Sequence, residues 1–247
     1  MHHFFIPPDS IQGQVVSFQA QLAHQIRHVL RLGEGDHVAV LDNSGMLYTV
    51  VLRAHAGEQA LKGQIVGAKT VTSEPQTHLA LYFGLSSREK VEWILQKGTE
   101  IGVSAFCPFI SSRTLVTSPE LSNKKLARWE RIIQEAAEQS GRGRLPVLNA
   151  PDNLLKCVLK AQSEYDLCLM AWEAATRDDF KLSELRTRFG GDSMALFIGP
   201  EGGFSVEEVD AAIEAGVQMV SLGARILRME TAALVFPALV LYELETM

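Results

Sequence analysis

The sequence predicts an α/β protein with a mostly parallel sheet, preceded by a smaller β-rich domain. From residue 78 onward, short apolar runs typical of buried strands alternate with segments whose apolar residues recur at helical spacing. Two of these runs, at 194–198 and 217–222, are each followed by a glycine-bearing loop and then by a helical pattern. Before residue 72, the strand-like runs are short and are separated by turn signals.

Residues 1–72 are expected to form a small β-barrel domain, because several short strands follow one another at close spacing. The polar run at 42–45 predicts a hairpin between the third and fourth of these strands. One helix is expected where Leu22, Ile26, Val29 and Leu30 share a face. The expected strands lie at 4–6, 15–18, 37–41, 47–52 and 60–66.

Residues 70–77 contain Ser73, Glu74 and Pro75 and are predicted to link this domain to a second one, which spans 73–247. Ser205 and Glu208 have the spacing of a capping box, so a helix should begin after Ser205. The second domain is expected to contain strands at 78–85, 105–110, 165–171, 194–198 and 217–222. Its other helices are expected at 88–102, 122–140, 154–159 and 182–189, and from Thr231 onward.

The composition is that of a globular protein, with 47% hydrophobic and 21% charged residues among 247. No apolar run is long enough for a confident membrane span and the N-terminus does not resemble a signal peptide, so we expect a cytoplasmic protein. The three cysteines, Cys107, Cys157 and Cys168, have no metal-ligand spacing. We expect free thiols and no bound metal.

The net charge of −6 argues mildly against a nucleic-acid partner. However, the segment from Arg113 to Arg144 holds seven basic residues against four acidic ones. This segment is either a basic surface for RNA or a solvated helix face with charges at i,i+4 spacing.

Two glycine-bearing loops, at 198–205 (IGPEGGFS) and 222–232 (LGARILRMETA), are the strongest candidates for a binding site. Open α/β sheets bind ligands at the carboxyl ends of their strands, which is where both loops lie. Neither loop has a dinucleotide-binding or P-loop pattern, and Glu201 would repel a phosphate. The loops are therefore ordinary tight turns or a site for a ligand without a polyphosphate. The clustering of Glu201, Arg225, Arg228 and Glu230 in them favours the site.

The two loop motifs together resemble the signature of the RsmE family of SPOUT-class methyltransferases. Weaker matches at 29–32, 96–103 and 138–142 extend the resemblance over essentially the whole chain. The resemblance implies S-adenosylmethionine-dependent methylation of N3 of a uridine in 16S ribosomal RNA. It also implies a PUA-like RNA-binding domain over 1–72, and a SPOUT domain over 73–247 whose trefoil knot forms the cofactor pocket.

The expected cofactor site is an apolar slot with backbone hydrogen bonds for adenine. Methylation at N3 also requires removal of the imide proton and stabilisation of charge on the uracil carbonyl oxygens. Arg228 or Arg225 is expected to stabilise this charge, and Glu201 or Glu230 to accept the proton, although Glu230 alternatively caps a helix. The expected cofactor residues are Met170, Ala171, Ile198, Gly199, Pro200, Glu201, Gly202, Leu222, Gly223, Ile226 and Leu227.

The expected partners are small-subunit ribosomal RNA or the assembled small subunit, and a second copy of the chain. A homodimer is expected because the segment 231–245 is apolar nearly all round a helix. Two other functions stay open: another SPOUT enzyme, which acts on a transfer-RNA ribose 2′-hydroxyl or guanine N1, and a non-catalytic RNA-binding protein. The candidate RNA contacts are Arg27, Arg31, Arg113, Lys124 and Arg142.

Overall fold

The computed structural model describes residues 1–53, 61–114, 121–176 and 179–245, and these form two compact units. The first unit contains Met1–Glu74 and Ala137–Leu145, and the second contains Pro75–Ala136 and Pro146–Met247. The chain therefore passes between the units three times. That residues 1–72 bind RNA and residues 73–247 carry the methyltransferase activity stays a prediction.

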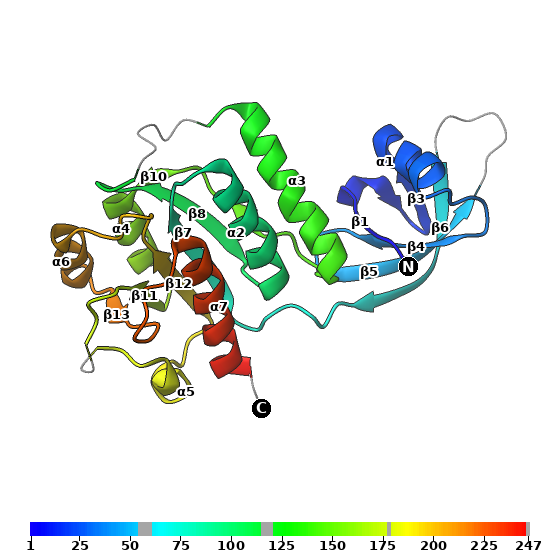
Figure 1. The fold of residues 1–247 in the computed structure, drawn as a ribbon. Coiled ribbons are helices and arrows are strands. Elements are labelled where there is room, and N and C mark those ends of the chain that lie inside the picture. The colour runs from blue at the N-terminus through cyan, green and yellow to red at the C-terminus, as the bar shows by residue number, and fades with distance from the viewer. Residues whose placement is uncertain (54–60, 115–120, 177–178, 246–247) are drawn as a thin grey trace. The chain divides into compact units, whose positions relative to one another are not determined.

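The first unit is built on a six-stranded sheet with the order β1-β4-β5-β6-β3-β2 (Figure 1). β1 pairs in parallel with β4, and the other neighbours are antiparallel. The hairpin predicted at 42–45 is confirmed, because β4 and β5 pair antiparallel with Leu41 opposite Leu47. The strands are β1 His3–Phe5, β2 Ile11–Gln12, β3 Val15–Phe18, β4 His37–Leu41, β5 Met46–Arg53 and β6 Leu61–Thr70.

The predicted helix of the first unit is present, with a fully buried Ile26 in the core beside the sheet. It consists of α1 Ala20–His24, which continues into a single π-helical turn, η2 Gln25–Val29. A short 3-10 turn, η1 Pro8–Ser10, follows β1.

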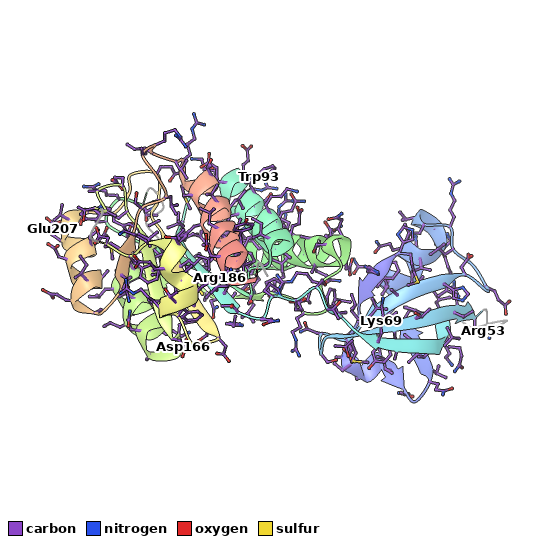
Figure 2. The ribbon with its side chains drawn as sticks, turned by 90° about the horizontal axis from the view of Figure 1, so that it is seen from below. Arg53, Lys69, Trp93, Asp166, Arg186 and Glu207 are labelled. Atoms are coloured by element: carbon purple, nitrogen blue, oxygen red, sulfur yellow. The ribbon has the colours of Figure 1, made fainter. Side chains whose placement is uncertain are left out.

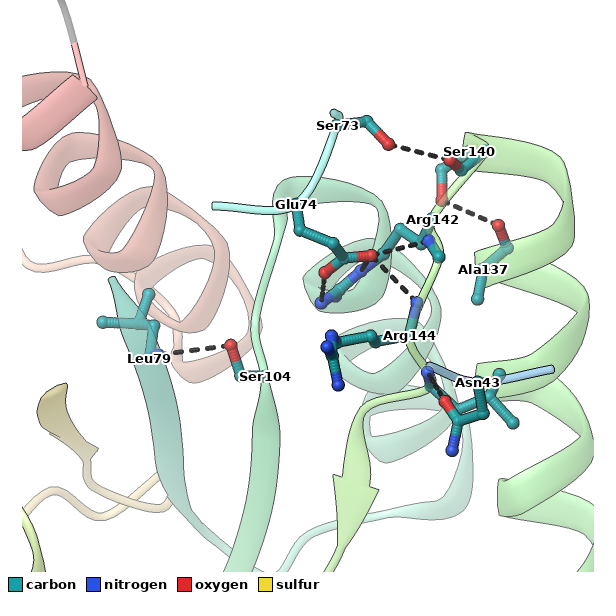
Figure 3. A network of polar contacts seen from close by, with 12 residues as sticks. Asn43, Ser73, Glu74, Leu79, Ser104, Ala137, Ser140, Arg142 and Arg144 are labelled. Carbon is teal, nitrogen blue, oxygen red and sulfur yellow. Dashed lines mark hydrogen bonds and ion pairs between the residues drawn. The ribbon is translucent and has the colours of Figure 1, made fainter. Parts of the chain in front are cut away.

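A polar network joins the segment 137–145 to the rest of the first unit (Figure 3). The Arg142 side chain is only 4% exposed, and its guanidinium lies 2.8 Å from the Glu74 carboxylate. The same carboxylate accepts hydrogen bonds from the backbone N–H groups of Gly143 and Arg144, at 2.7 and 3.1 Å. Burial raises the pKa of Glu74, but these partners outweigh it and hold the pKa below its usual value. The Arg142 charge is thus buried and paired, and its contact with RNA stays a prediction that this geometry does not favour.

The second unit contains a seven-stranded sheet that is parallel throughout its described strands, as the alternation of strands and helices predicts. The order is β10-β8-β7-β12-β11-β13, and β9 pairs with β8. The strands are β7 His78–Gly84, β8 Ala105–Ile110, β9 Val147–Leu148, β10 Asp152–Asn153, β11 Leu167–Ala171, β12 Ser193–Ile198 and β13 Gln218–Val220.

Helices cover both faces of this sheet, which explains why its central strands are apolar at nearly every position. Leu79, Leu81 and Phe83 of β7 belong to the core with α2, α3 and α7, whereas Ala80 and Tyr82 belong to the core with α4 and α6 (Figure 1). The helices are α2 Arg88–Ile101, α3 Asn123–Ser140, α4 Leu154–Glu164, η3 Leu182–Glu184, α5 Leu185–Arg188, α6 Val206–Glu214 and α7 Met229–Glu245.

The last helix, α7, packs against α2 and contains Pro237. Arg186 of α5 donates a hydrogen bond from Nε to the carbonyl oxygen of Glu243, at 2.6 Å, near the end of α7. Figure 2 labels Arg186 beside this helix. Three large apolar side chains of α2 and α7 remain exposed: Trp93 (49%), Leu239 (39%) and Tyr242 (65%). Within the described residues, no helix combines the length and apolarity needed to cross a membrane.

Candidate active site

A pocket of about 460 Å³ lies where β11, β12 and β13 end. These three strands are neighbours in the parallel sheet, so their carboxyl ends meet at one edge. The pocket walls come from the segments after β11, β12 and β13, and from α2. They are formed by Lys90, Ala171, Trp172, Glu173, Ile198, Gly199, Pro200, Glu201, Gly202, Gly203, Phe204, Ser221, Leu222, Gly223, Arg225, Ile226, Leu227, Arg228, Met229 and Ala232.

The loop after β12 is compact because glycines let its backbone fold onto itself. A Cβ atom at Gly199 would lie 3.1 Å from the carbonyl carbon of Gly203, and Gly203 has a φ of +68°. The backbone N–H of Gly203 donates to the carbonyl oxygen of Pro200, at 2.9 Å, which closes a turn. Gly84, at the end of β7, packs closely against this loop. A Cβ atom added at Gly84 would lie only 2.6 Å from the backbone nitrogen of Pro200, so a larger residue would not fit there.

The loop after β13 is open by comparison. Gly223 has a φ of +112°, and its backbone N–H donates to Ser221 Oγ at 3.3 Å. Ile226 is 86% exposed and Arg225 and Arg228 are also exposed, although all three line the pocket. An apolar side chain exposed at a pocket rim is available to contact a ligand.

Lys90 of α2 connects two carboxylates of the pocket. Its Nζ lies 2.9 Å from Glu201 Oε1 and 3.5 Å from Glu230 Oε2. Ser86 Oγ also donates a hydrogen bond to Glu201 Oε1. Burial raises the pKa of Glu201, but the hydrogen bonds from Ser86 and Lys90 outweigh it and lower the pKa. The hydrogen bond to Glu201 likewise raises the pKa of Lys90. Glu230 Oε2 is buried without a hydrogen bond among the described residues.

The side chains of the pocket suit S-adenosylmethionine. Gly199 and Gly203 line the pocket with their backbone, and Ile198, Leu222 and Leu227 supply apolar walls. Glu173 and Glu201 disfavour a polyphosphate, whereas the cofactor carries a positive sulfonium and an amino-acid group. The pocket thus fits a nucleoside with a short charged chain.

The structure brings together all but one of the predicted cofactor residues. Met170 is fully buried among the residues between the sheet and helices α4 and α6, and it is not part of the pocket wall. Its side chain points to the opposite face because neighbouring residues of a strand alternate, so its successor Ala171 lines the pocket instead. The predicted catalytic residues Arg228 and Glu201 also line the pocket, and Glu230 is joined to it through Lys90.

Several residues that line the pocket were not predicted from the sequence. Trp172 and Glu173 directly follow β11, so the end of that strand was the signal for them. Lys90 precedes the two loops by more than a hundred residues in the sequence, and no local pattern marks it. Ser221 was also missed, whereas Gly203, Phe204, Met229 and Ala232 lie within the two predicted loops but were not singled out as contacts.

The predicted RNA contacts other than Arg142 lie at separate places. Arg27 is half-buried in η2, Arg31 is exposed with a φ of +57°, and Lys124 is exposed in the first turn of α3. Arg113 is exposed beside the pocket, where its Nη1 donates to the carbonyl oxygen of Gly202 at 2.9 Å. These four remain candidates for RNA binding.

Comparisons with known proteins show the family to which this chain is similar. Residues 72–241 match the family described as RNA methyltransferase domain. Ribosomal RNA small subunit methyltransferase E of Bacillus subtilis is 30% identical over 97% of this chain and 91% of its own length. The Synechocystis protein of the same name is 34% identical over 94% of this chain and 74% of its own length.

Solved structures give the same result. The chain is similar to ribosomal RNA small subunit methyltransferase E of Neisseria gonorrhoeae bound to S-adenosylmethionine, with a TM-score of 0.84, 31% identity and coverage of 96% and 95% of the two chains. A Legionella pneumophila structure with bound S-adenosylmethionine has a TM-score of 0.81 and 28% identity over 97% and 96% of the chains. The chain belongs to the family of RNA methyltransferases that are named ribosomal RNA small subunit methyltransferase E.

Proposed function

We propose that this protein transfers the methyl group of S-adenosylmethionine to N3 of a uridine in 16S ribosomal RNA. It is an S-adenosylmethionine-dependent methyltransferase of small-subunit ribosomal RNA, as its family membership shows. The observation that carries the proposal is the pocket itself, which the two family motifs form at the ends of β12 and β13. The choice of uridine N3 rests on the resemblance of these motifs.

The cofactor, when bound, supplies an electrophilic methyl group. Ile198, Leu222 and Leu227 hold its adenine, with hydrogen bonds from the backbone of the two loops. The base presents N3 to the methyl carbon, so a bond forms from N3 to carbon while the carbon–sulfur bond breaks and its electrons stay on sulfur. The target base must lie in a loop or be flipped from its stack to enter the pocket.

Arg228 stabilises the negative charge that develops on the uracil carbonyl oxygens. Its guanidinium lines the pocket and is exposed, so it is available to a substrate. The imide proton passes to a carboxylate oxygen of Glu201 or Glu230. The hydrogen bonds that Glu201 accepts from Ser86 and Lys90 lower its pKa, which weakens its carboxylate as a base.

The first unit is assigned as a PUA-like RNA-binding domain and the second as a SPOUT domain with a trefoil knot. Both assignments rest on the family resemblance, and Arg27 and Arg31 of the first unit and Arg113 and Lys124 of the second are the candidate contacts. The protein acts in the cytoplasm, where its ribosomal substrate is found. It forms a homodimer through α7, whose Leu239 and Tyr242 are exposed although the helix is apolar.

The decisive experiment is methylation of undermethylated small ribosomal subunits with labelled S-adenosylmethionine, followed by mapping of the modified base. We expect N3-methyluridine in 16S RNA, and a loss of about a hundredfold in rate for Arg228→Ala. Arg188→Ala is the matched control, because Arg188 of α5 is an exposed arginine that pairs with Glu184 and lies outside the basic segment. Modification of a transfer RNA would favour another SPOUT activity. A protein that binds RNA but gives no heat with S-adenosylmethionine in calorimetry would be non-catalytic.

A further inference from the structure

Lys90 occupies a place in the pocket that the reaction described above does not explain. It lies in the first turn of α2, lines the pocket, and has a side chain that is 31% exposed. Its ammonium contacts Glu201, in the loop after β12, and Glu230, in the first turn of α7. One cation from a third element therefore joins the two segments that form opposite walls of the pocket.

We propose that Lys90 is a positioning residue that fastens the loop at 199–204 to the start of α7 and so sets the shape of the cofactor pocket. The proposal rests on the proposed function, because it takes the pocket as the cofactor site. Lys90 itself takes no part in the transfer of the methyl group or the proton.

The helix that carries Lys90 is a firm base for such a link. Val91, Ile94 and Leu95 of α2 are fully buried in the core of the second unit, so the start of the helix has little freedom. Glu201 and Glu230, in contrast, lie on or directly after glycine-bearing loops. Their side chains are 30% and 21% exposed, and two carboxylates this close to one ammonium would repel each other without it.

A second role for the Lys90 charge makes a different prediction. Glu173, Arg225 and Arg228 line the same pocket, and the alternative role for Lys90 is only to balance the charge of that pocket. Loss of a pure charge balance would tighten binding of the cationic sulfonium cofactor and leave its uncharged-sulfur product, S-adenosylhomocysteine, unaffected. Loss of a positioning contact would weaken both ligands by a similar factor.

Calorimetric titration of the full-length protein with both ligands distinguishes these roles. We expect Lys90→Met to weaken both ligands about tenfold, since two partly exposed ion pairs are lost. Lys90→Arg should recover most of the affinity because it restores the cation. Lys97→Met is the matched control: Lys97 lies on the same helix, is 33% exposed and pairs with Glu100 at 2.7 Å, but it is not part of the pocket wall, and its loss should change affinity less than twofold.

Hydrogen exchange of the ligand-free protein tests the link without the cofactor. In Lys90→Met the amides at 199–204 and 229–232 should exchange faster than in the wild type, whereas Lys97→Met should leave them unchanged. Unaltered exchange, or tighter binding of S-adenosylmethionine alone, would overturn the proposal. A wild-type protein that does not bind S-adenosylmethionine would refute the proposed function instead, and the exchange result would still decide on Lys90.

Discussion

Glu74 and Arg142 have side chains that are 19% and 4% exposed, so little water reaches the ion pair between them. In such an environment, removal of one partner leaves the other charge buried without compensation. Glu74 also accepts two backbone hydrogen bonds, from residues that immediately follow Arg142. The Glu74 carboxylate therefore binds both the Arg142 guanidinium and the backbone of residues 143 and 144.

Glu74→Gln should lower the free energy of unfolding by about 2 kcal/mol at pH 7. Because the folded state lowers the pKa of Glu74, its carboxylate contributes stability above its unfolded pKa, and this contribution is lost as the pH falls through the folded pKa. The difference between the two proteins should therefore shrink on acidification. Urea unfolding at pH 7 and at successively lower pH measures it.

Glu135→Gln is the control for this prediction. Glu135 pairs with Arg131 at 2.8 Å, but the two side chains are 59% and 75% exposed, so the solvent already screens the pair. Its loss should change stability little at any pH. A Glu74→Gln protein that matched this control would show that the buried pair contributes nothing.

Individual site residues could be predicted where the sequence carries a local signal. Gly199, Gly202 and Gly223 belong to contiguous motifs, and all three line the pocket. The buried ion pair of Arg142 was not predicted, because a basic residue in a basic segment gives no sign of its partner, which lies 68 positions earlier. Lys90 was missed for the same reason, since only the folded chain brings it to Glu201.

At the scale of elements, two reciprocal hydrogen bonds between Ser205 and Glu208 fix the start of α6. Ser205 Oγ accepts from the backbone N–H of Glu208 at 3.2 Å, and Glu208 Oε2 accepts from the backbone N–H of Ser205 at 2.9 Å. The capping box predicted from the sequence is thus confirmed. Glu208 Oε1 additionally accepts from the backbone N–H of Ser112 at 2.7 Å, which ties the helix to the loop after β8.

Ser205→Ala should destabilise the protein by about 1 kcal/mol, because the backbone N–H of Glu208 loses its acceptor at the helix start. For a chain of this length that corresponds to a fall of about 2–4 °C in the melting temperature. Calorimetric melting measures the change. Ser163→Ala, which removes a hydroxyl bonded to the Lys160 carbonyl oxygen late in α4, should leave the melting temperature nearly unchanged. An equal shift in both variants would argue against the cap.

The elements that the sequence predicted well are those with a long periodic pattern or a clear end signal. The helix expected at 88–102 is α2, and that at 122–140 is α3. β9 and β10 have two residues each, too few for any period to appear. The helix expected at 182–189 is instead a 3-10 turn followed by the one-turn α5, because isolated short helices gain too few hydrogen bonds to extend.

At the scale of the whole molecule, the α/β class with a parallel sheet was predictable because buried parallel strands are apolar on both faces. The strand order was not, since β12 lies between β7 and β11 although it follows both in the sequence. This strand order brings the ends of β11, β12 and β13 together at the pocket. Because the order could not be predicted, the residues that line the pocket could be predicted only in part.

The proposed homodimer is tested by light scattering coupled to size exclusion at low micromolar concentration. We expect a mass of twice the 27.2 kDa chain. Leu239→Glu should shift the protein toward the monomer, because it places a charge on the exposed side of α7. Ile213→Glu, at a similarly exposed position on α6, is the control and should stay dimeric. A wild-type mass near that of one chain would exclude the dimer.

The three passages of the chain between its units limit how the protein can be taken apart. The segment Ala137–Leu145 belongs to the first unit although it is encoded within the second. A fragment that starts at residue 73 would carry this segment and Glu74 but lack the rest of the first unit, and a fragment that stops at residue 72 would lack both the segment and Glu74. No single cut yields two intact modules. Grafting the first unit onto another protein would therefore require a junction at each of the three passages, with the end of α3 transplanted along with the first 74 residues.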